Sequence, residues 1–293
     1  MGTSTGAGTS TGAGTSTGAG TSTGAGTSRS TGTGTAPDAA TAPMRVLDTS
    51  GAAYRRAFEL FLAGTDEKPL THARLTEVAT GLDRRRVLLD VGAGEGRTTT
   101  HLAQYFERTV AIEPSAAMRE RLRAVCPDAL VLPDPIDAAE PPEPADLVHL
   151  SHVLYYVPSE DWLRTVGRVL DWAAPGGTLL VVLQNPESPC MRMAAHFTGV
   201  RYDLRPLAEQ LAEQGPEHAV ALETLDLSYR TDRLAEAVDV AEFMVNVADL
   251  AVLDRLPDRD ELTAYVERHF ARPDGGYAIG HTQDMLTVRR APR

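Results

Sequence analysis

The sequence predicts an α/β fold, a doubly wound and mostly parallel sheet with helices on both faces. Short apolar runs of strand length alternate along the chain with longer segments whose apolar residues recur at helical spacing. One such run, Val87–Val91, leads into a turn with glycines at 92, 94 and 96, as at strand-to-helix turns that bind ligands. Because parallel strands are covered on both faces, continuous apolar runs between helices favour a parallel sheet.

The first 43 residues differ from the rest in composition. Residues 3–26 are four copies of Thr-Ser-Thr-Gly-Ala-Gly, and Ser, Thr and Gly dominate as far as Pro43. Such a segment buries too little apolar surface to offset the entropy of ordering it. We therefore predict a disordered tail over residues 1–43 and one folded domain over residues 44–293.

The elements in the first part of the domain follow from apolar spacing and from helix breakers. Apolar residues at 54, 57, 58, 61 and 62 predict a helix that covers the sheet, and Pro114 suits the start of a helix. Pro175–Gly177 predicts a turn. In order, we expect a helix over 54–62, a strand over 87–91, a helix over 98–106, a strand ending at Glu113, a helix over 116–125, strands over 129–132 and 147–150, a helix over 162–172 and a strand over 178–183.

Beyond Asn185 the pattern is looser. Residues 189–215 are predicted to be helical and rich in loops, and we expect an insert over 188–216 to help roof the substrate pocket. Alternation of apolar and polar residues predicts a strand over 220–229. Apolar spacing predicts a helix over 238–253, and a last apolar run predicts a strand over 277–288.

Composition excludes several classes of function. Acidic residues outnumber basic ones by 40 to 28, for a net charge of −12, which disfavours nucleic acid as a partner. No apolar stretch approaches a membrane span and the start lacks the pattern of a signal peptide, so we expect a cytoplasmic protein with no membrane partner. Cys126 and Cys190 are too few for a disulfide framework, and the histidines form no pattern with acids that predicts a metal site.

The glycine turn is unsuited to a pyrophosphate. The dinucleotide fingerprint G-x-G-x-x-G needs a small residue at position 97, where this chain has Arg97. Asp90 and Glu95 would repel an anionic ligand, so a zwitterionic or cationic one fits better. Glu113 ends the next strand 21 residues after Gly92, the arrangement that holds the two hydroxyls of a ribose.

Four motifs together resemble the class I S-adenosylmethionine-dependent methyltransferases. They are Asp90–Gly96, Glu113, Asp146–His152 and Trp172–Val182, in the order and spacing of that family. The resemblance implies a Rossmann-like methyltransferase fold, a seven-stranded sheet whose last strand is antiparallel, with S-adenosyl-L-methionine as cofactor. Asp137, or else Asp134, is the candidate for the adenine amino group, although a turn aspartate is the alternative. The predicted cofactor-binding residues are Asp90, Gly92, Gly94, Gly96, Glu113, Pro114, Asp137 and Ser151.

Further segments resemble the histamine N-methyltransferases: Tyr54–Glu67, Ile112–Ala116, His149–Val157 and Gly276–Leu286. The resemblance places Glu67 at an acid that binds the substrate amine, and Ser151 and His152 where the family contacts cofactor and substrate. Thr282, Gln283 or Asp284 takes the place of a substrate-binding Asn. Met118 and His152 stand where that family has Gln. The predicted substrate-binding residues are Glu67, His152, Tyr155, Tyr156, Gln283 and Asp284.

The predicted reaction is methyl transfer to a small molecule, with an amine nitrogen as the first choice of acceptor. Glu67 and His152 are the candidate catalytic residues, Glu67 by binding a cationic group and His152 by accepting a proton. The alternatives are a solvated loop acid at 67, a structural histidine at 152, and tyrosines that belong to the core. At the level of function, the alternatives are O-methylation of a carboxylate or hydroxyl, on a peptide or specialised metabolite, and a cofactor-binding regulator without catalysis.

Overall fold

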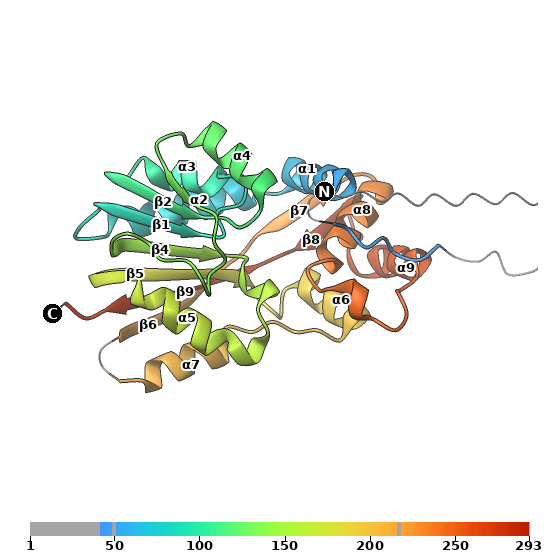
Figure 1. Ribbon diagram of the computed structural model, residues 1–293. Helices are drawn as coiled ribbons and strands as arrows, with labels where there is room; N and C mark the ends of the chain where they lie inside the picture. The colour runs from blue at the N-terminus through green and yellow to red at the C-terminus, as the bar shows by residue number, and fades with distance from the viewer. Residues whose placement is uncertain (1–41, 49–50, 216–217, 293) are drawn as a thin grey trace, which may run out of the picture. The chain divides into compact units, whose positions relative to one another are not determined.

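A seven-stranded sheet forms the centre of the computed structural model, which describes residues 42–48, 51–215 and 218–292; residues 1–41 of the predicted tail lie outside this part. Its strand order is β3-β2-β1-β4-β5-β9-β6, and only β9 runs antiparallel to its neighbours (Figure 1). This confirms the predicted fold class. A second sheet pairs β7 with β8. The strands are β1 Val87–Val91, β2 Arg108–Ile112, β3 Leu130–Leu132, β4 Ala145–Ser151, β5 Ala173–Gln184, β6 His218–Leu225, β7 Ser228–Thr231, β8 Tyr277–Gly280 and β9 Gln283–Arg290.

Helices cover both faces of the large sheet. Residues 162–171 and 205–213 pack on one face, and the helices of residues 67–80, 97–103 and 116–125 lie on the other (Figure 1). Side chains of successive strand residues point to opposite faces, which is why the apolar runs are continuous. The helices are α1 Ala52–Gly64, α2 Glu67–Thr80, α3 Arg97–Ala103, α4 Ala116–Val125, α5 Trp162–Asp171, α6 Pro189–Thr198, α7 Arg205–Glu213, α8 Leu234–Val245 and α9 Arg259–His269.

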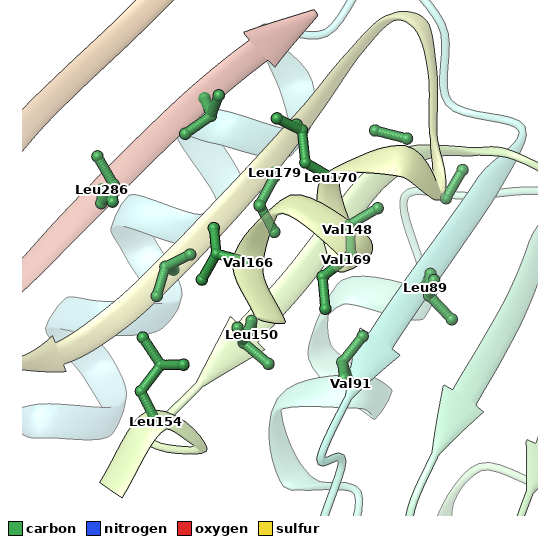
Figure 2. Close-up of a cluster of buried hydrophobic side chains, with 14 of the residues drawn as sticks. Leu89, Val91, Val148, Leu150, Leu154, Val166, Val169, Leu170, Leu179 and Leu286 are labelled. Carbon is green, nitrogen blue, oxygen red and sulfur yellow. The ribbon is translucent and has the colours of Figure 1, made fainter. Parts of the chain in front are cut away.

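The main core lies between the sheet and the pair α5 and α7. Leu89 of β1, Val148 of β4 and Leu179 of β5 meet Val166 and Val169 of α5 there, all of them buried (Figure 2). Burying aliphatic side chains of this size contributes roughly 1.5–3 kcal/mol each. This packing holds the carboxyl ends of the strands in fixed positions relative to one another.

A separate apolar cluster joins α1, α6, α8, α9 and the small β7–β8 sheet. The expectation that the first helix covers the sheet is wrong, because α1 packs against α8 and β7 instead (Figure 1). The physical reason is that its aromatic stripe meets Phe243 of α8. Among the described residues, none of the helices has both the length and the apolar character needed to cross a membrane.

Two predicted strands are each divided in the structure. The run 220–229 splits into β6 and β7, and the run 277–288 splits into β8 and β9. Each run therefore contributes one strand to the large sheet and one to the small sheet. The predicted turn Pro175–Gly177 lies inside β5, where the register with β4 changes as in a bulge. Apolar spacing did not predict α2 or α9. The start of α9 carries a capping box formed by Asp258 and Glu261.

One buried carboxylate ties residues 42–48 to this second cluster. Glu242 of α8 is fully buried, and its oxygens accept hydrogen bonds from the backbone N–H of Arg45 at 2.6 Å and from the Arg45 Nε at 2.8 Å. Arg259, at the start of α9, donates to the same side chain at 2.5 Å. The segment, α8 and α9 are therefore held together by the charge of Glu242.

We expect Glu242→Ala to lower the free energy of unfolding by about 2–3 kcal/mol, because several charge-assisted hydrogen bonds lose their acceptor at once. Asp239→Asn is the matched control, because Asp239 binds the same two arginines from a more exposed position; it should cost less than about 1 kcal/mol. Urea unfolding followed by circular dichroism measures both. Equal losses in the two variants would contradict the role given to Glu242.

Candidate functional site

A cavity of about 840 Å³ opens at the carboxyl ends of the parallel strands. The turn after β1, the ends of β2 and β4 and the last residue of β5 form its floor, and α1, the first turn of α2 and the end of α8 form its walls. Ligands of open α/β sheets bind at this edge. None of the described residues of the predicted insert, 188–215, is in the lining, so the cavity is covered by α1 and α8 instead.

The glycine turn and Glu113 form one half of the cavity. Gly92 has a φ of +74°, and a Cβ there would lie 2.3 Å from Val153 Cγ2, so the close approach needs glycine. Glu113 is buried and accepts hydrogen bonds from the backbone N–H of Gly94 at 2.8 Å and of Ser115 at 2.7 Å. One carboxylate therefore fixes both the turn and the start of α4, and each of its oxygens keeps a lone pair for a ligand hydroxyl.

The other predicted cofactor residues divide into two groups. Pro114, Asp137 and Ser151 line the cavity with Glu113 and the turn, whereas Asp134 is outside the lining. Asp90 and Gly96 lie behind it: Asp90 accepts a hydrogen bond from Thr99 Oγ1 at 2.5 Å and pairs with His149 Nδ1 at 2.8 Å, and Gly96 packs on Leu122 ahead of α3. These two residues shape the turn from inside the fold.

Glu67 carries a buried negative charge in the other half of the cavity. It is the first residue of α2 and only 5% exposed, and its Oε1 lies 3.2 Å from Lys68 Nζ. Burial alone would raise the pKa of this carboxyl, but the charge of Lys68 and the nearby His152 and His281 outweigh burial and lower it. Glu67 is therefore ionised at neutral pH.

His152 is held in an unusual backbone conformation at the end of β4. Its φ of +57° lies in the left-handed region, where residues other than glycine are uncommon and mark functional sites. Thr71 Oγ1 donates to Gln283 Oε1 at 3.2 Å, which turns the Gln283 amide nitrogen toward His152 Nε2 at 3.1 Å. Nε2 is then an acceptor, and this network assigns the ring proton to Nδ1. Burial lowers the pKa of His152 to about 4, although Glu67 opposes this.

His281 flanks Glu67 from the last part of the chain. The Glu67 backbone N–H donates to Thr65 Oγ1 at 3.1 Å, and the same hydroxyl forms a hydrogen bond with His281 Nε2 at 2.7 Å. The other ring nitrogen, Nδ1, lies 3.8 Å from Glu67 Oε2 and is buried without a hydrogen-bond partner among the described residues. His281 thus borders the Glu67 carboxylate from within the protein.

Aromatic rings of α1 and α8 line the same cavity as Glu67. Tyr54, Phe58 and Phe61 lie along α1 and meet Phe243 of α8 with ring centroids 5.3–5.9 Å apart. Such faces attract cations as well as apolar groups. This wall therefore combines with Glu67 to form a surface suited to a positively charged ligand.

The predicted tyrosines and last-strand residues take different positions. Tyr155 stacks against His152 at 5.8 Å, and its hydroxyl accepts the backbone N–H of Gln184, whereas Tyr156 is 72% exposed at the edge of the lining. Gln283 is behind His152 and outside the lining. Asp284 is also outside it, because its carboxylate accepts hydrogen bonds from Asn185 and Thr224.

Sequence reasoning missed Lys68, Gln184 and Phe243, which line the cavity, and His281 beside it. Lys68 had a signal, since it adjoins Glu67 in the sequence. The others had none, because the fold brings them to the site from distant segments. Within the described ranges, no group of three or more His, Cys, Asp or Glu side chains is arranged to hold a metal ion.

Comparisons with known proteins agree with this geometry. A family described as "Methyltransferase domain" matches residues 65–219, just over half of the chain. A protein from Bacillus halodurans assigned as a methyltransferase is 15% identical with a TM-score of 0.55, covering 75% of this chain and 98% of that one. YcgJ from Bacillus subtilis is 14% identical with a TM-score of 0.53, covering 76% and 100%.

N-methyltransferase NodS from Bradyrhizobium japonicum, solved with S-adenosyl-L-homocysteine, is 16% identical with a TM-score of 0.47, covering 83% of this chain and 100% of that one. The likeness to the two Bacillus proteins, each with a TM-score above 0.5, shows a common fold. A search of curated proteins finds no match.

The shifted histidine should make stability depend on pH. The pKa of His152 is about 4 in the folded chain against about 6.5 when unfolded, so the unfolded state binds more protons between these values. The stability is fully present above about pH 6.5 and is lost as the pH falls toward 4. Replacing His152 by Gln should flatten the slope of unfolding free energy against pH near pH 5 by roughly 1 kcal/mol per pH unit.

Urea unfolding at several pH values between 4.5 and 7 measures this slope. The exposed His269→Gln is the matched control and should keep the wild-type slope. A wild-type slope in His152→Gln would contradict the burial of a neutral ring at this position.

Proposed function

The chain belongs to the methyltransferase-domain family and is an S-adenosylmethionine-dependent class I methyltransferase; from this premise we propose that it methylates a nitrogen of a small cationic amine, as the resemblance to histamine N-methyltransferases implies. The observation that carries the proposal is the ionised, buried Glu67 in a cavity that the aromatic rings of α1 and α8 also line. A carboxylate and aromatic faces together favour an ammonium or imidazolium group over a neutral or anionic one.

For the cofactor, we propose that Glu113 accepts hydrogen bonds from the two ribose hydroxyls and that Asp137 accepts one from the adenine amino group. Both residues line the cavity, which supports this assignment. Gly92 lets the Val153 side chain pack directly against the turn, where a Cβ would clash with it. When bound, S-adenosylmethionine supplies a methyl group already activated on a sulfonium sulfur. The chain must therefore position the acceptor and exclude water more than it must activate a leaving group.

We assign His152 a positioning role in place of the proton acceptor expected from the sequence. Its Nε2 is occupied by Gln283 and its pKa is about 4, so the ring is a weak base at neutral pH. The Nδ1–H is left to donate to an acceptor atom of the ligand other than the reacting nitrogen. Glu67 would bind the charged group of the same molecule, and a second nitrogen that is already neutral would use its lone pair to form the bond to the methyl carbon as the bond from that carbon to sulfur breaks.

Methyl transfer from labelled S-adenosylmethionine to a panel of amines, carboxylic acids and phenols tests the proposed function. Label on amine nitrogen supports it. Label only on oxygen would replace it with the O-methyltransferase alternative, and cofactor binding without transfer to any compound would indicate a regulator.

For the cofactor half, we expect Glu113→Ala to weaken binding of S-adenosyl-L-homocysteine by roughly 10- to 100-fold, since charge-assisted hydrogen bonds to the ribose are lost. Isothermal titration calorimetry measures the affinity. Glu120→Ala, an exposed acid on α4, is the control and should keep wild-type affinity. Unchanged binding in Glu113→Ala would remove Glu113 from the ribose site.

For the acceptor half, Glu67→Gln should raise the KM for a cationic amine by roughly 10- to 100-fold because the ion pair is lost, while the affinity for S-adenosyl-L-homocysteine stays near wild type. His152→Gln retains an N–H donor, so it should keep more of the kcat than His152→Ala does. Steady-state kinetics of the three variants measures both effects. If His152→Gln were as inactive as His152→Ala, the ring would act as a base after all.

A further inference from the structure

We propose that the acceptor is an α-amino acid with a nitrogen in its side chain, whose ammonium group binds Glu67 and whose carboxylate binds Lys68. The inference rests on the proposed function, an amine acceptor held at Glu67. Lys68 is a second recognition element in this proposal, one that a simple amine would leave unused.

The ion pair of Glu67 and Lys68 is part of the cavity surface. Lys68 Nζ lies 3.2 Å from Glu67 Oε1, and both side chains line the cavity. Glu67 is enclosed, with its side chain 7% exposed, whereas the Lys68 side chain is 31% exposed and has the longer, more flexible stem. Lys68 can therefore move away from Glu67 toward a ligand while the carboxylate stays in place.

A ligand with only a positive charge is poorly matched to this pair. It would compete with Lys68 for the same carboxylate, and two cations would then share one anion in a partly buried space. A ligand with an adjacent ammonium and carboxylate satisfies both side chains, because each charge gains an opposite partner. The zwitterionic head group of an amino acid has this arrangement.

Of the cations in the described lining, Lys68 is the one in contact with Glu67. Arg121 pairs with Glu95 and Arg164 with Asp161, Arg168 donates to the carbonyls of Ile136 and Ala139, and Arg55 is exposed on α1. The side chains beside Glu67 other than Lys68 are neutral imidazole rings and aromatic rings. Lys68 is therefore the group placed to bind an acceptor carboxylate next to Glu67.

This placement also orients the acceptor. Glu67 and Lys68 hold the head group at the start of α2, and His152, directly after β4, lies close enough to Glu67 for the two charges to interact. A nitrogen in the side chain would then extend toward the methyl donor at the glycine turn with its lone pair free to attack the methyl carbon. The proposed class thus contains amino acids with an imidazole or amino group in the side chain.

Matched pairs of compounds that differ only by the carboxylate test the proposal. L-Histidine is compared with histamine, and L-lysine with cadaverine, by calorimetric binding to the full chain saturated with S-adenosyl-L-homocysteine, and by methyl transfer. Wild type should bind one carboxylated compound at least about tenfold more tightly than its partner amine. Lys68→Met should abolish or reverse that preference, and Lys68→Arg should retain it.

The outcomes separate this inference from the proposed function. If wild type binds the simple amines more tightly and Lys68→Met leaves the ratio unchanged, the Lys68 inference is overturned while the amine acceptor stands. If neither member of any pair binds although S-adenosyl-L-homocysteine does, both fail. A wild-type thermal unfolding midpoint for Lys68→Met shows that its altered preference does not come from misfolding.

Discussion

The buried negative charge of Glu67 is the constraint on which the acceptor half of the cavity depends. A carboxylate that is only 5% exposed must be compensated, and here the ammonium group of Lys68 supplies the opposite charge, with His152 and His281 beside the carboxylate. Thr65 links the Glu67 backbone to His281, and Thr71 links α2 through Gln283 to His152. Hydrogen bonds therefore connect the start of α2 to the chain just before β9 and to the first residue of β9. The charge that suits the site to a cation also sets the positions of the histidines around it.

The two halves of the cavity are built in different ways. The nucleoside half comes from consecutive strand-to-helix turns, where Glu113 connects the turn after β1 to the start of α4 within about two dozen residues. The acceptor half brings together residues 54–71, 152, 243 and 281–283, which are distant in sequence. Substitutions in the strand-to-helix turns would disrupt cofactor binding. In the acceptor half, single side chains can change without altering those turns, so one fold can serve many acceptors.

This difference explains what could be predicted from the sequence. The mostly parallel sheet and the bounds of α4 follow from apolar runs and breakers, the antiparallel strand follows from the resemblance to methyltransferases, and Glu113 follows from its place after a strand. The splitting of the run 220–229 could not be foreseen, because apolar alternation continues through Leu225 and Leu227 although the chain passes from one sheet to the other. In the run 277–288, the polar residues 281–284 lie between apolar segments of strand length, and the structure divides the run there. The position of His281 beside Glu67 depends on that division. From the sequence alone, Phe243 is predicted to be an ordinary core residue. Its place in the cavity lining depends on the packing of α8 against α1.

The predicted insert contributes to the cavity indirectly. Ser188 caps α6, and Cys190 Sγ donates to Gln184 Oε1 at 2.7 Å, so this segment holds the last residue of β5, which is in the lining. The helix α6 also packs on α8, whose Phe243 and Met244 face the cavity. A helix behind the wall can thus set the width of the acceptor space without contacting the acceptor. Because the wall is close-packed, substitutions on the buried face of α6 would be transmitted to α8, and residues outside the lining would shape acceptor size.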